Sequence, residues 1–311
     1  MIRSIQDDTS LASLERKIAT GDIAELFSGL DDAITSFTSD MSAGYVHAAQ
    51  KTARRIDAAV ERAFRFDLAD SDAVDFMREV TDDLKAAMIA EQQAVARRVV
   101  QHGQARGLTP RQIAREVRAS AGLTVEQVDH VERYRQALER GDYTAAMKYE
   151  LADGRFDPAL RNARAQGKVL GPDRIEKMVD RYRENWVAHR GKVVSLTEGQ
   201  KMTHAGIAEA VDQAIERGVL PENAFTKVWH TRGDHRVRHS HRFMSGQRRR
   251  LWEPFLSGNG NLLMYPGDPN APLSDIVNCR CTLEVVMPSP LSKTFRLDLE
   301  LVDYELAPLR S

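Results

Sequence analysis

The stretch Arg217-Gly-Val-Leu-Pro-Glu-Asn-Ala-Phe-Thr-Lys-Val-Trp229 marks a change of structural type along the chain. Residues 1–220 contain three of the eleven prolines, whereas residues 221–311 contain the other eight. Because proline lacks a backbone N–H and interrupts helices, the first part can be helical and the last part is mostly not. The glycine and proline in this stretch predict the end of a helix, and its last five residues suit a short strand.

Helical signals precede this stretch. Residues 74–105 carry apolar side chains at helical spacing. Thr109-Pro110 predicts an N-cap followed by proline in the first turn, and Thr124–Gln127 forms a capping box whose helix ends at Gly141. Two further helices are expected over residues 174–190 and 197–217.

Strand and loop signals follow it. Residues 281–287 suit a second strand, and residues 257–261 and 265–272 have the composition of turns. Residues 294–302 alternate between apolar and charged side chains, so we expect a strand that buries one face against a sheet of its own or of a partner. The predicted fold class is α+β: a mainly helical N-terminal region, then a small mixed α/β C-terminal domain and a terminal amphipathic strand.

Composition restricts the class of protein. The 311 residues include 44 Lys and Arg and 45 Asp and Glu, a net charge of −1, which disfavours a protein that binds polyanions over its whole surface. The only cysteines, Cys279 and Cys281, are too close in sequence for an unstrained disulfide, so we expect free thiols or metal ligands. We find no signal-peptide pattern and no run of about 20 apolar residues, which predicts a soluble protein made in a reducing cytoplasm.

The segment 227–251 concentrates positive charge. It contains eight basic residues and one acid, a local net charge of +7, together with four of the nine histidines. Two interpretations stay open. The segment binds phosphates or an acidic protein surface, with Arg248, Arg249 and Arg250 as the anion-binding residues, or it is a solvated face whose charge is balanced by acids elsewhere in the fold.

Asp234, Arg238 and His241 have the spacing i, i+4, i+7. If residues 234–243 form a helix, the three side chains project from one face. The Asp–Arg pair would then hold the N-terminus of that helix, and the histidine would point in the same direction. The alternative to a functional set is a structural hydrogen-bond network.

Cys279 and Cys281 open the second predicted strand and share a face of it, because residues i and i+2 of a strand point the same way. We expect His241 to approach both thiols, with Asp234 or His239 as a fourth member. Two thiolates and a histidine suit zinc, the one cofactor that the sequence suggests. Two packed free cysteines without metal are the alternative.

Catalytic motifs are missing from the sequence. G-x-S-x-G, Walker A, H-E-x-x-H and G-x-G-x-x-G do not occur. The histidines and cysteines of the last third still admit a metal-dependent nuclease. Residues 109–140 can be read as a helix–turn–helix, although such helix pairs are common in proteins with no DNA role.

A set of motifs in the last third follows a distinctive order: Lys227-Val-Trp229-His-Thr231, Asp234-His-Arg236-Val-Arg238, His241, Gly246, Phe255, Tyr265-Pro-Gly-Asp268 and Asn278-Cys-Arg-Cys281. This order resembles that of the Mu F-like minor head proteins of tailed phages, and the resemblance covers roughly residues 166–287. Beside the histidine and cysteines, the motif positions are Trp229, Arg236, Arg238, Gly246, Pro266, Gly267, Asp268 and Asn278.

The resemblance implies a structural protein of the virion and not an enzyme. It would be made in the host cytoplasm, lie inside the capsid near the portal, and assist head assembly and DNA packaging or ejection. Its partners would be the portal protein, the capsid interior and packaged double-stranded DNA, with no membrane. The implied division is a helical region over 1–165, the Mu F-like domain over 166–287 and a strand extension over 288–311. The alternative function is a zinc-dependent nuclease or a DNA-binding protein that acts on packaged DNA.

Overall fold

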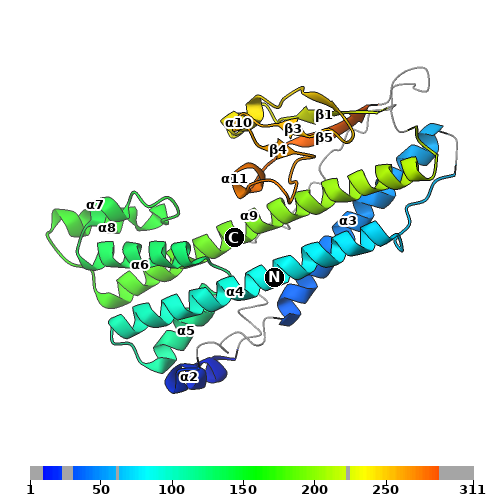
Figure 1. Cartoon of the computed structure of the whole chain (residues 1–311). Helices are drawn as coiled ribbons and strands as arrows, with labels where there is room; N and C mark the ends of the chain where they lie inside the picture. The colour runs from blue at the N-terminus through cyan, green and yellow to red at the C-terminus, as the bar shows by residue number, and fades with distance from the viewer. Residues whose placement is uncertain (1–9, 23–30, 61–62, 222–224, 287–311) are drawn as a thin grey trace. The chain divides into compact units, whose positions relative to one another are not determined.

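The computed structural model describes residues 10–22, 31–60, 63–221 and 225–286 of the chain (Figure 1). The chain has the expected α+β class: 64% of the described residues are helical, with a mainly helical N-terminal region and a few antiparallel strands near the C-terminus. The strand expected over residues 294–302 lies outside the described residues. Within the described ranges, no helix is both long and apolar enough to cross a membrane.

The chain divides into two compact units. Unit 1 combines Met1–Thr38 with Val80–Lys192, and unit 2 combines Ser39–Glu79 with Val193–Ser311. This division differs from the boundary expected at residue 165, because both halves of the chain contribute helices to each unit. The unit boundaries fall inside three long helices, α3 (Asp31–Val60), α4 (Ser71–Ala105) and α9 (Pro172–Glu216).

Unit 1 is built from helices around an apolar core. Five short elements connect α4 to α9: α5 (Pro110–Ser120), α6 (Val125–Glu139), α7 (Tyr143–Ala146), the 3₁₀ helix η2 (Gly154–Phe156) and α8 (Asp157–Ala165). Another helix, α2 (Leu11–Thr20), packs against α5. In the core, the rings of Tyr134 and Tyr182 have centroids 4.4 Å apart, and each side chain is 1% exposed. Large aromatic side chains therefore supply much of the apolar area buried in this unit.

The starts of α5 and α6 are confirmed as predicted. Thr109 and Gln112 form a reciprocal capping box, and Thr124 and Gln127 form another. Gly141 follows α6 with φ of 74°, a left-handed conformation that glycine adopts without steric cost. Local sequence is therefore enough to place both of these helices.

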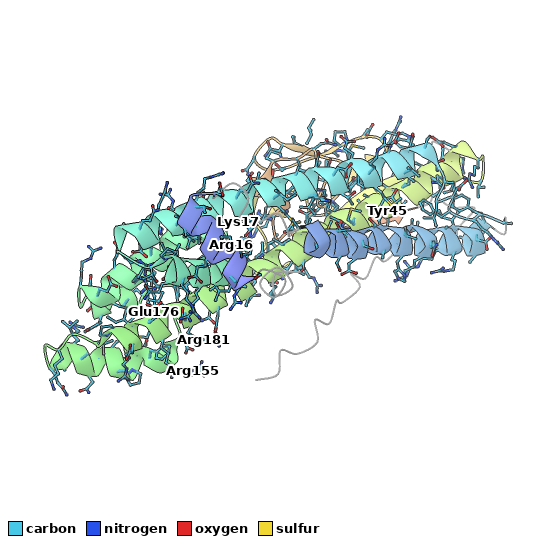
Figure 2. All side chains as sticks on the ribbon, turned by 90° about the horizontal axis from the view of Figure 1, so that it is seen from below. Arg16, Lys17, Tyr45, Arg155, Glu176 and Arg181 are labelled. Atoms are coloured by element: carbon cyan, nitrogen blue, oxygen red, sulfur yellow. The ribbon has the colours of Figure 1, made fainter. Side chains whose placement is uncertain are left out.

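Surface ion pairs connect the η2 region to α9. The carboxylate of Asp153 accepts hydrogen bonds from Arg155 and from Arg181, and both arginines are labelled in Figure 2. The guanidinium of Arg155, with its side chain 75% exposed, holds the pKa of Asp153 far below its usual value. Such exposed pairs orient the chain and contribute little to stability.

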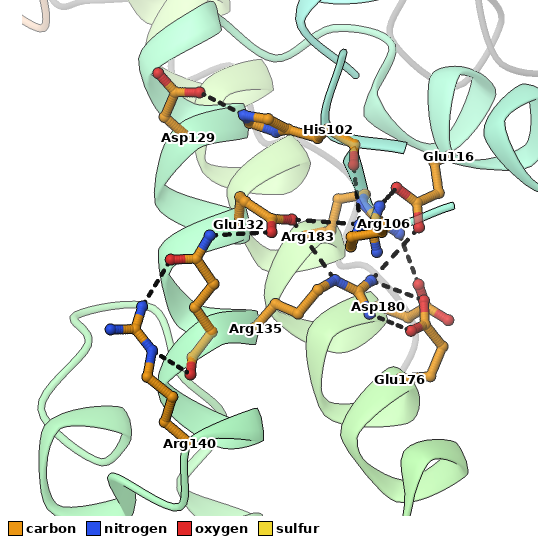
Figure 3. Close-up of polar contacts among 11 residues, drawn as sticks. His102, Arg106, Glu116, Asp129, Glu132, Arg135, Arg140, Glu176, Asp180 and Arg183 are labelled. Atoms are coloured by element: carbon orange, nitrogen blue, oxygen red, sulfur yellow. Dashed lines mark hydrogen bonds and ion pairs between the residues drawn. The ribbon is translucent and has the colours of Figure 1, made fainter. Parts of the chain in front are cut away.

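A more buried network of ion pairs joins α4, α5, α6 and α9 in unit 1 (Figure 3). At its centre, the Arg135 side chain is 4% exposed and contacts the carboxylates of Glu116, Glu132 and Glu176. The contact with Glu176 is bidentate. Arg106, which directly follows α4, shares the other two carboxylates. Because a buried charge without partners is costly, this network constrains how the four helices pack.

In unit 2, α3 and α9 approach each other closely at Gly206. A Cβ atom at Gly206 would lie 2.4 Å from the carbonyl oxygen of Tyr45, which is labelled in Figure 2, so only glycine fits this crossing. We expected two helices where α9 is one continuous helix, and that prediction is wrong. No proline occurs between residues 190 and 197, and the glycine at position 191 costs a helix only about 1 kcal/mol.

The strands of unit 2 form two small antiparallel sheets. The first has the order β2 (Arg248–Arg250), β1 (Thr226–His230), β5 (Thr282–Val286), and the second pairs β3 (Phe255–Leu256) with β4 (Leu262–Leu263). β1 and β5, the two predicted strands, pair along their whole length, from Thr226 opposite Val286 to His230 opposite Thr282. Two helices of four residues each, α10 (His239–Arg242) and α11 (Leu273–Ile276), lie beside the strands (Figure 1).

Candidate metal centre

Unit 2 brings His241, Cys279 and Cys281 together. The histidine lies on α10, and the two cysteines lie directly before β5. His241 Nδ1 is 3.5 Å from Sγ of Cys279 and 3.5 Å from Sγ of Cys281. All three side chains are buried, with exposed fractions of 1%, 4% and 2%. The predicted convergence of these three residues is therefore confirmed.

The helix expected over residues 234–243 is wrong in its extent, because only α10 is helical within that range. Asp234 instead opens a turn in which its Oδ1 accepts the backbone N–H of Arg236 at 3.0 Å. Gly233, with φ of 69°, precedes this turn. A short carboxylate side chain that bonds its own backbone competes with helix formation. The expected i, i+4, i+7 face therefore does not form.

Asp234 lies outside the group of sulfur and nitrogen donors. Both of its oxygens accept from the Arg280 guanidinium, at 2.7 and 2.8 Å, and this lowers the pKa of the carboxyl to about 2. Arg238, expected to pair with Asp234, donates instead to the carbonyl of Val277. His239, the other expected fourth member, packs against a neighbouring phenylalanine ring. Among the described residues, no fourth His, Cys, Asp or Glu joins the three donors.

Asp275 of α11 faces the other ring nitrogen of His241. Its Oδ1 is 3.5 Å from Nε2, and its side chain is completely buried. Burial by itself raises the pKa of this carboxyl, but hydrogen bonds from Asn261, Ser240 and Ser257 outweigh burial, and the pKa is lowered. A charged carboxylate at this place favours the tautomer with its proton on Nε2. The Nδ1 lone pair is then directed at the two sulfurs.

The two thiols differ in their electrostatic environment. A hydrogen bond from the Cys281 thiol lowers the pKa of Cys279; burial opposes this effect, and His241 lowers the pKa further when its ring carries a proton on Nδ1 as well. The same thiol–thiol hydrogen bond, together with burial, raises the pKa of Cys281. The site by itself therefore favours one thiolate, at Cys279. A metal ion would supply the positive charge that a second thiolate needs.

A polar stripe on α9 positions the segment that carries the cysteines. Thr197, Gln200 and His204 are buried and share one helical face at i, i+3 and i+7. Thr197 Oγ1 accepts the backbone N–H of Asn278 at 2.8 Å, and Gln200 Nε2 donates to the Cys281 carbonyl at 2.6 Å. Burial lowers the pKa of His204 to about 4, so this imidazole is neutral at pH 7. The stripe therefore holds the cysteine segment against α9 by hydrogen bonds.

Three residues of the resemblance surround the donors directly. Trp229 on β1 is completely buried, and its ring meets that of His241 edge to face with centroids 5.5 Å apart. Gly246, with φ of 79°, donates its N–H to the Trp229 carbonyl at 2.8 Å. Asn278 adopts φ of 54° immediately before the first cysteine. These residues build the wall of the site and the turn that aims the cysteines.

The loop before α11 holds most of the remaining motif positions. Asp268 is 3% exposed and accepts a backbone N–H on each side of the loop, from Met264 and from Asn270. Gly267 has φ of 85°, and next to it Pro266 is buried. A buried aspartate that bonds two backbone donors fixes the loop conformation. Arg236, by contrast, is exposed.

The basic segment 227–251 presents only part of its charge to solvent. Lys227 is 3% exposed and donates to a loop carbonyl at 2.9 Å. Within β2, Arg248 and Arg250 are exposed, whereas Arg249 is half-buried and donates to a backbone carbonyl. Two of the three predicted anion-binding side chains are therefore accessible to a partner.

Sequence reasoning missed Asp275 and the polar stripe of α9. No motif distinguishes Asp275 from the other acids of the chain, because its role depends on donors from separate segments. The stripe does carry a signal, since Thr197, Gln200 and His204 are polar residues at helical spacing. Polar residues that follow the period of a buried face indicate a specific partner on another element.

The donor geometry fits a zinc ion. A tetrahedral ion with bonds of about 2.0 Å to nitrogen and about 2.3 Å to sulfur keeps these two atoms about 3.5 Å apart. Both N···S distances here are 3.5 Å, and the three donor atoms lie within 4.8 Å of one another. The residues could therefore hold zinc with little rearrangement.

Known proteins give no independent indication of what the site does. No protein-family model, curated protein or solved structure matches the chain significantly. The chemistry of the site and the order of its motifs are therefore the features that indicate a function.

Proposed function

We propose that the protein is a structural minor head protein of a tailed phage, located inside the capsid near the portal. The observation that supports this is the arrangement of the motif residues. Trp229, His241 and the Asn278–Cys281 segment, far apart in sequence, form one compact cluster whose ring, imidazole and thiols are buried. Residues that form the interior of a module serve its fold, which suits an assembly component.

Zinc is the cofactor that this cluster suits best. Thiolate and imidazole donors favour zinc, whereas magnesium and calcium prefer oxygen ligands. His241, Cys279 and Cys281 would hold the ion, and Asp275 would orient the histidine from behind. Zinc would join α10 to the start of β5 and so stabilise a region with little regular secondary structure.

Burial of the donors favours a structural role over a catalytic one. A structural zinc usually has four protein ligands, and a catalytic zinc has three with the fourth position open to its substrate. The described residues supply three donors, so burial is the observation that separates the two roles. Here each donor residue is at most 4% exposed, which would keep a polymer such as DNA away from the ion. The rival function, a zinc-dependent nuclease, predicts cleavage of plasmid DNA when zinc, magnesium or manganese is added. Intact plasmid with all three metals would remove it.

Elemental analysis of the purified full chain tests the metal. We expect about one zinc per chain in the wild type and almost none in the Cys279→Ser, Cys281→Ser double variant. Thr282→Ser, a change one residue further along and outside the donor set, should retain the zinc. A wild-type protein without zinc would contradict the metal and leave the packed cluster as the structural element.

The virion tests the role itself. We expect the chain in purified particles, in few copies, and imaging without imposed icosahedral symmetry should place it at the portal vertex. A phage that carries the double cysteine variant should produce fewer full heads than one that carries Thr282→Ser. Particles that lack the chain altogether would contradict the proposal.

The basic segment would face an anionic partner, the portal protein or packaged DNA. Replacing the exposed Arg248 and Arg250 with Gln should weaken this binding and reduce the salt slope of log K by about 1.8, because each phosphate contact contributes about 0.9. Arg249→Gln should change the slope less, since this side chain is half-buried. Binding that is unchanged at low and at high salt would exclude a role for these arginines.

A further inference from the structure

Helix α5 of unit 1 presents a row of arginines to solvent. Arg111, Arg115 and Arg118 have the spacing i, i+4, i+7, which places them along one face of the helix. All three side chains are exposed. None of them forms an ion pair or a side-chain hydrogen bond with another described residue. The row is therefore available to a partner.

No acid of α5 balances this row. The one acidic residue of the helix, Glu116, is turned to another flank, where it pairs with Arg106 and Arg135 (Figure 3). The core-facing flank is apolar, since Ile113 and Val117 are buried in unit 1. The helix thus has one flank for the core, one for the ion-pair network, and one that carries three uncompensated positive charges.

The following helix, α6, is not free to read bases. In a helix–turn–helix that reads DNA, the second helix enters the major groove. Here α6 buries Val128, Val131, Tyr134 and Leu138 in the core. Its Asp129 also pairs with Arg98 and His102 of α4. The helix pair therefore offers its first helix to a partner, which suits contact with a backbone rather than with base edges.

The composition of the exposed α5 face selects the class of partner. Apart from the arginines, the exposed positions of the helix are Pro110 and Gln112. Protein interfaces centre on apolar or aromatic anchors, and this face has none. Interfaces with nucleic acid are polar and strongly positive, and a guanidinium can bond a phosphate with two N–H groups. The row spans about 10 Å of helix axis, and three successive phosphates of one strand span about 7 Å of duplex axis, so flexible arginine side chains can reach all three.

We propose that α5 binds the phosphate backbone of a nucleic-acid duplex independently of base sequence. Arg111, Arg115 and Arg118 each neutralise one phosphate. Binding then releases counterions and weakens steeply with salt, while unrelated sequences bind equally well. The site lies in unit 1 and depends neither on zinc nor on a role in the phage head.

Fluorescence anisotropy of the full-length protein with a duplex of about 30 base pairs tests this site. The test variant carries Arg111→Gln, Arg115→Gln and Arg118→Gln, in a background with Arg248→Gln and Arg250→Gln so that β2 does not contribute. The matched control removes the same charge from three different helices, by Arg133→Gln, Arg164→Gln and Arg174→Gln. A DNA and an RNA duplex of one length, used in parallel, identify which polymer is preferred.

We expect the test variant to lose at least about 2.5 units of the salt slope of log K, since three contacts contribute about 2.7. When salt rises from about 50 to about 200 mM, the affinity of the parent protein should therefore fall about 40-fold more than the affinity of the test variant. The control should keep the parental slope. Thermal unfolding followed by circular dichroism shows whether each variant is folded. If the triple variant does not fold, Arg115→Gln alone replaces it, with an expected change in the salt slope of about 0.9.

Three results would overturn the proposal. The test variant could bind both duplexes with the parental affinity and salt slope. The control could lose as much affinity as the test variant, which would assign the effect to net charge. The variant could lose binding to polyglutamate while it keeps duplex binding, which would make the partner an acidic protein surface.

Discussion

Units 1 and 2 reach stability by different means. Unit 1 consists of helices that pack around a continuous apolar core, with the buried ion pairs of Arg135 between them. The strands of unit 2 are only two to five residues long. Beside an apolar core of its own, its C-terminal segment buries polar side chains, among them Lys227, Asp268 and Asp275. Where strands are short and form few backbone hydrogen bonds, polar side chains must supply hydrogen-bond partners for the buried backbone groups and for one another.

This difference predicts where each unit is vulnerable. Loss of an apolar or ionic contact in unit 1 removes one contribution among many. In unit 2, the segment around His241 and the cysteines depends on one small polar cluster that holds α10, α11 and the start of β5 together. Disruption of that cluster should therefore unfold a region rather than weaken a contact.

The largest effect is expected from the cysteines. Cys279→Ser with Cys281→Ser should remove the metal and lose several kcal/mol of stability, a part of the about 10–16 kcal/mol with which structural zinc binds small domains at pH 7. Hydrogen exchange read by mass spectrometry should show lost protection in β1 and β5, while α5 and α6 stay protected. Thr282→Ser is the control. Equal protection in the double variant and the control would break the contrast between the units.

The next effect concerns the network of unit 1. Arg135→Met should lower the free energy of unfolding by about 3 kcal/mol, because Glu116 and Glu132 then share Arg106 alone and the half-exposed Glu176 loses its bidentate partner. Denaturation with urea measures the change. The control is Arg161→Met on α8, whose exposed pair with Asp157 should contribute no more than about 0.5 kcal/mol. Similar costs for both variants would show that the network is not stabilising.

A close helix crossing gives the third effect. Gly206→Ala should destabilise unit 2 by about 1–3 kcal/mol, because its Cβ would lie 2.4 Å from the Tyr45 carbonyl oxygen. Gly199, on the same helix, has open space where a Cβ would lie. Gly199→Ala should therefore stabilise the protein by about 0.5–1 kcal/mol through helix propensity. Thermal melts should show a lower Tm for Gly206→Ala and a higher Tm for Gly199→Ala than for the wild type. A stabilising Gly206→Ala would contradict the close approach of α3 and α9.

The smallest effect is a dependence on pH. Burial, and then repulsion from Glu209 and Glu216, raise the pKa of Asp212 to about 7, against the opposing effect of Lys227. The folded state therefore binds a proton that the unfolded state has released, so the unfolding free energy should fall as pH rises from about 4 to about 7. Asp212→Asn should flatten this fall and gain about 1–2 kcal/mol at pH 8.

The control for the pH series is Glu216→Gln, an exposed neighbour on α9. This variant should keep most of the pH dependence of the unfolding free energy, since burial is the main cause of the raised pKa of Asp212. Urea denaturation at several pH values measures both variants. A wild-type stability that does not change between pH 4 and 7 would show that Asp212 is not held in its protonated form.

The helices α4, α5 and α6 were predicted close to their bounds, whereas α2 and α3 were not predicted, and the candidate site was predicted only in part. The capping boxes at Thr109 and Thr124 place α5 and α6 because a cap acts within four residues. The predicted helix over 234–243 failed because the Asp234 side chain bonds its own turn and the Arg280 side chain. Propensity within a window does not include such partners.

Local rules therefore determined the starts of α5 and α6, the two strands β1 and β5, and the position of both thiols at the start of β5, since each follows from short-range backbone geometry. Tertiary structure alone decided that the thiols meet His241, that Asp275 faces its other ring nitrogen, and that each unit combines two separate segments of the chain. These features depend on which distant segments meet. Burying or pairing a charged group changes the free energy of folding only after the distant segments have come together and excluded the water between them.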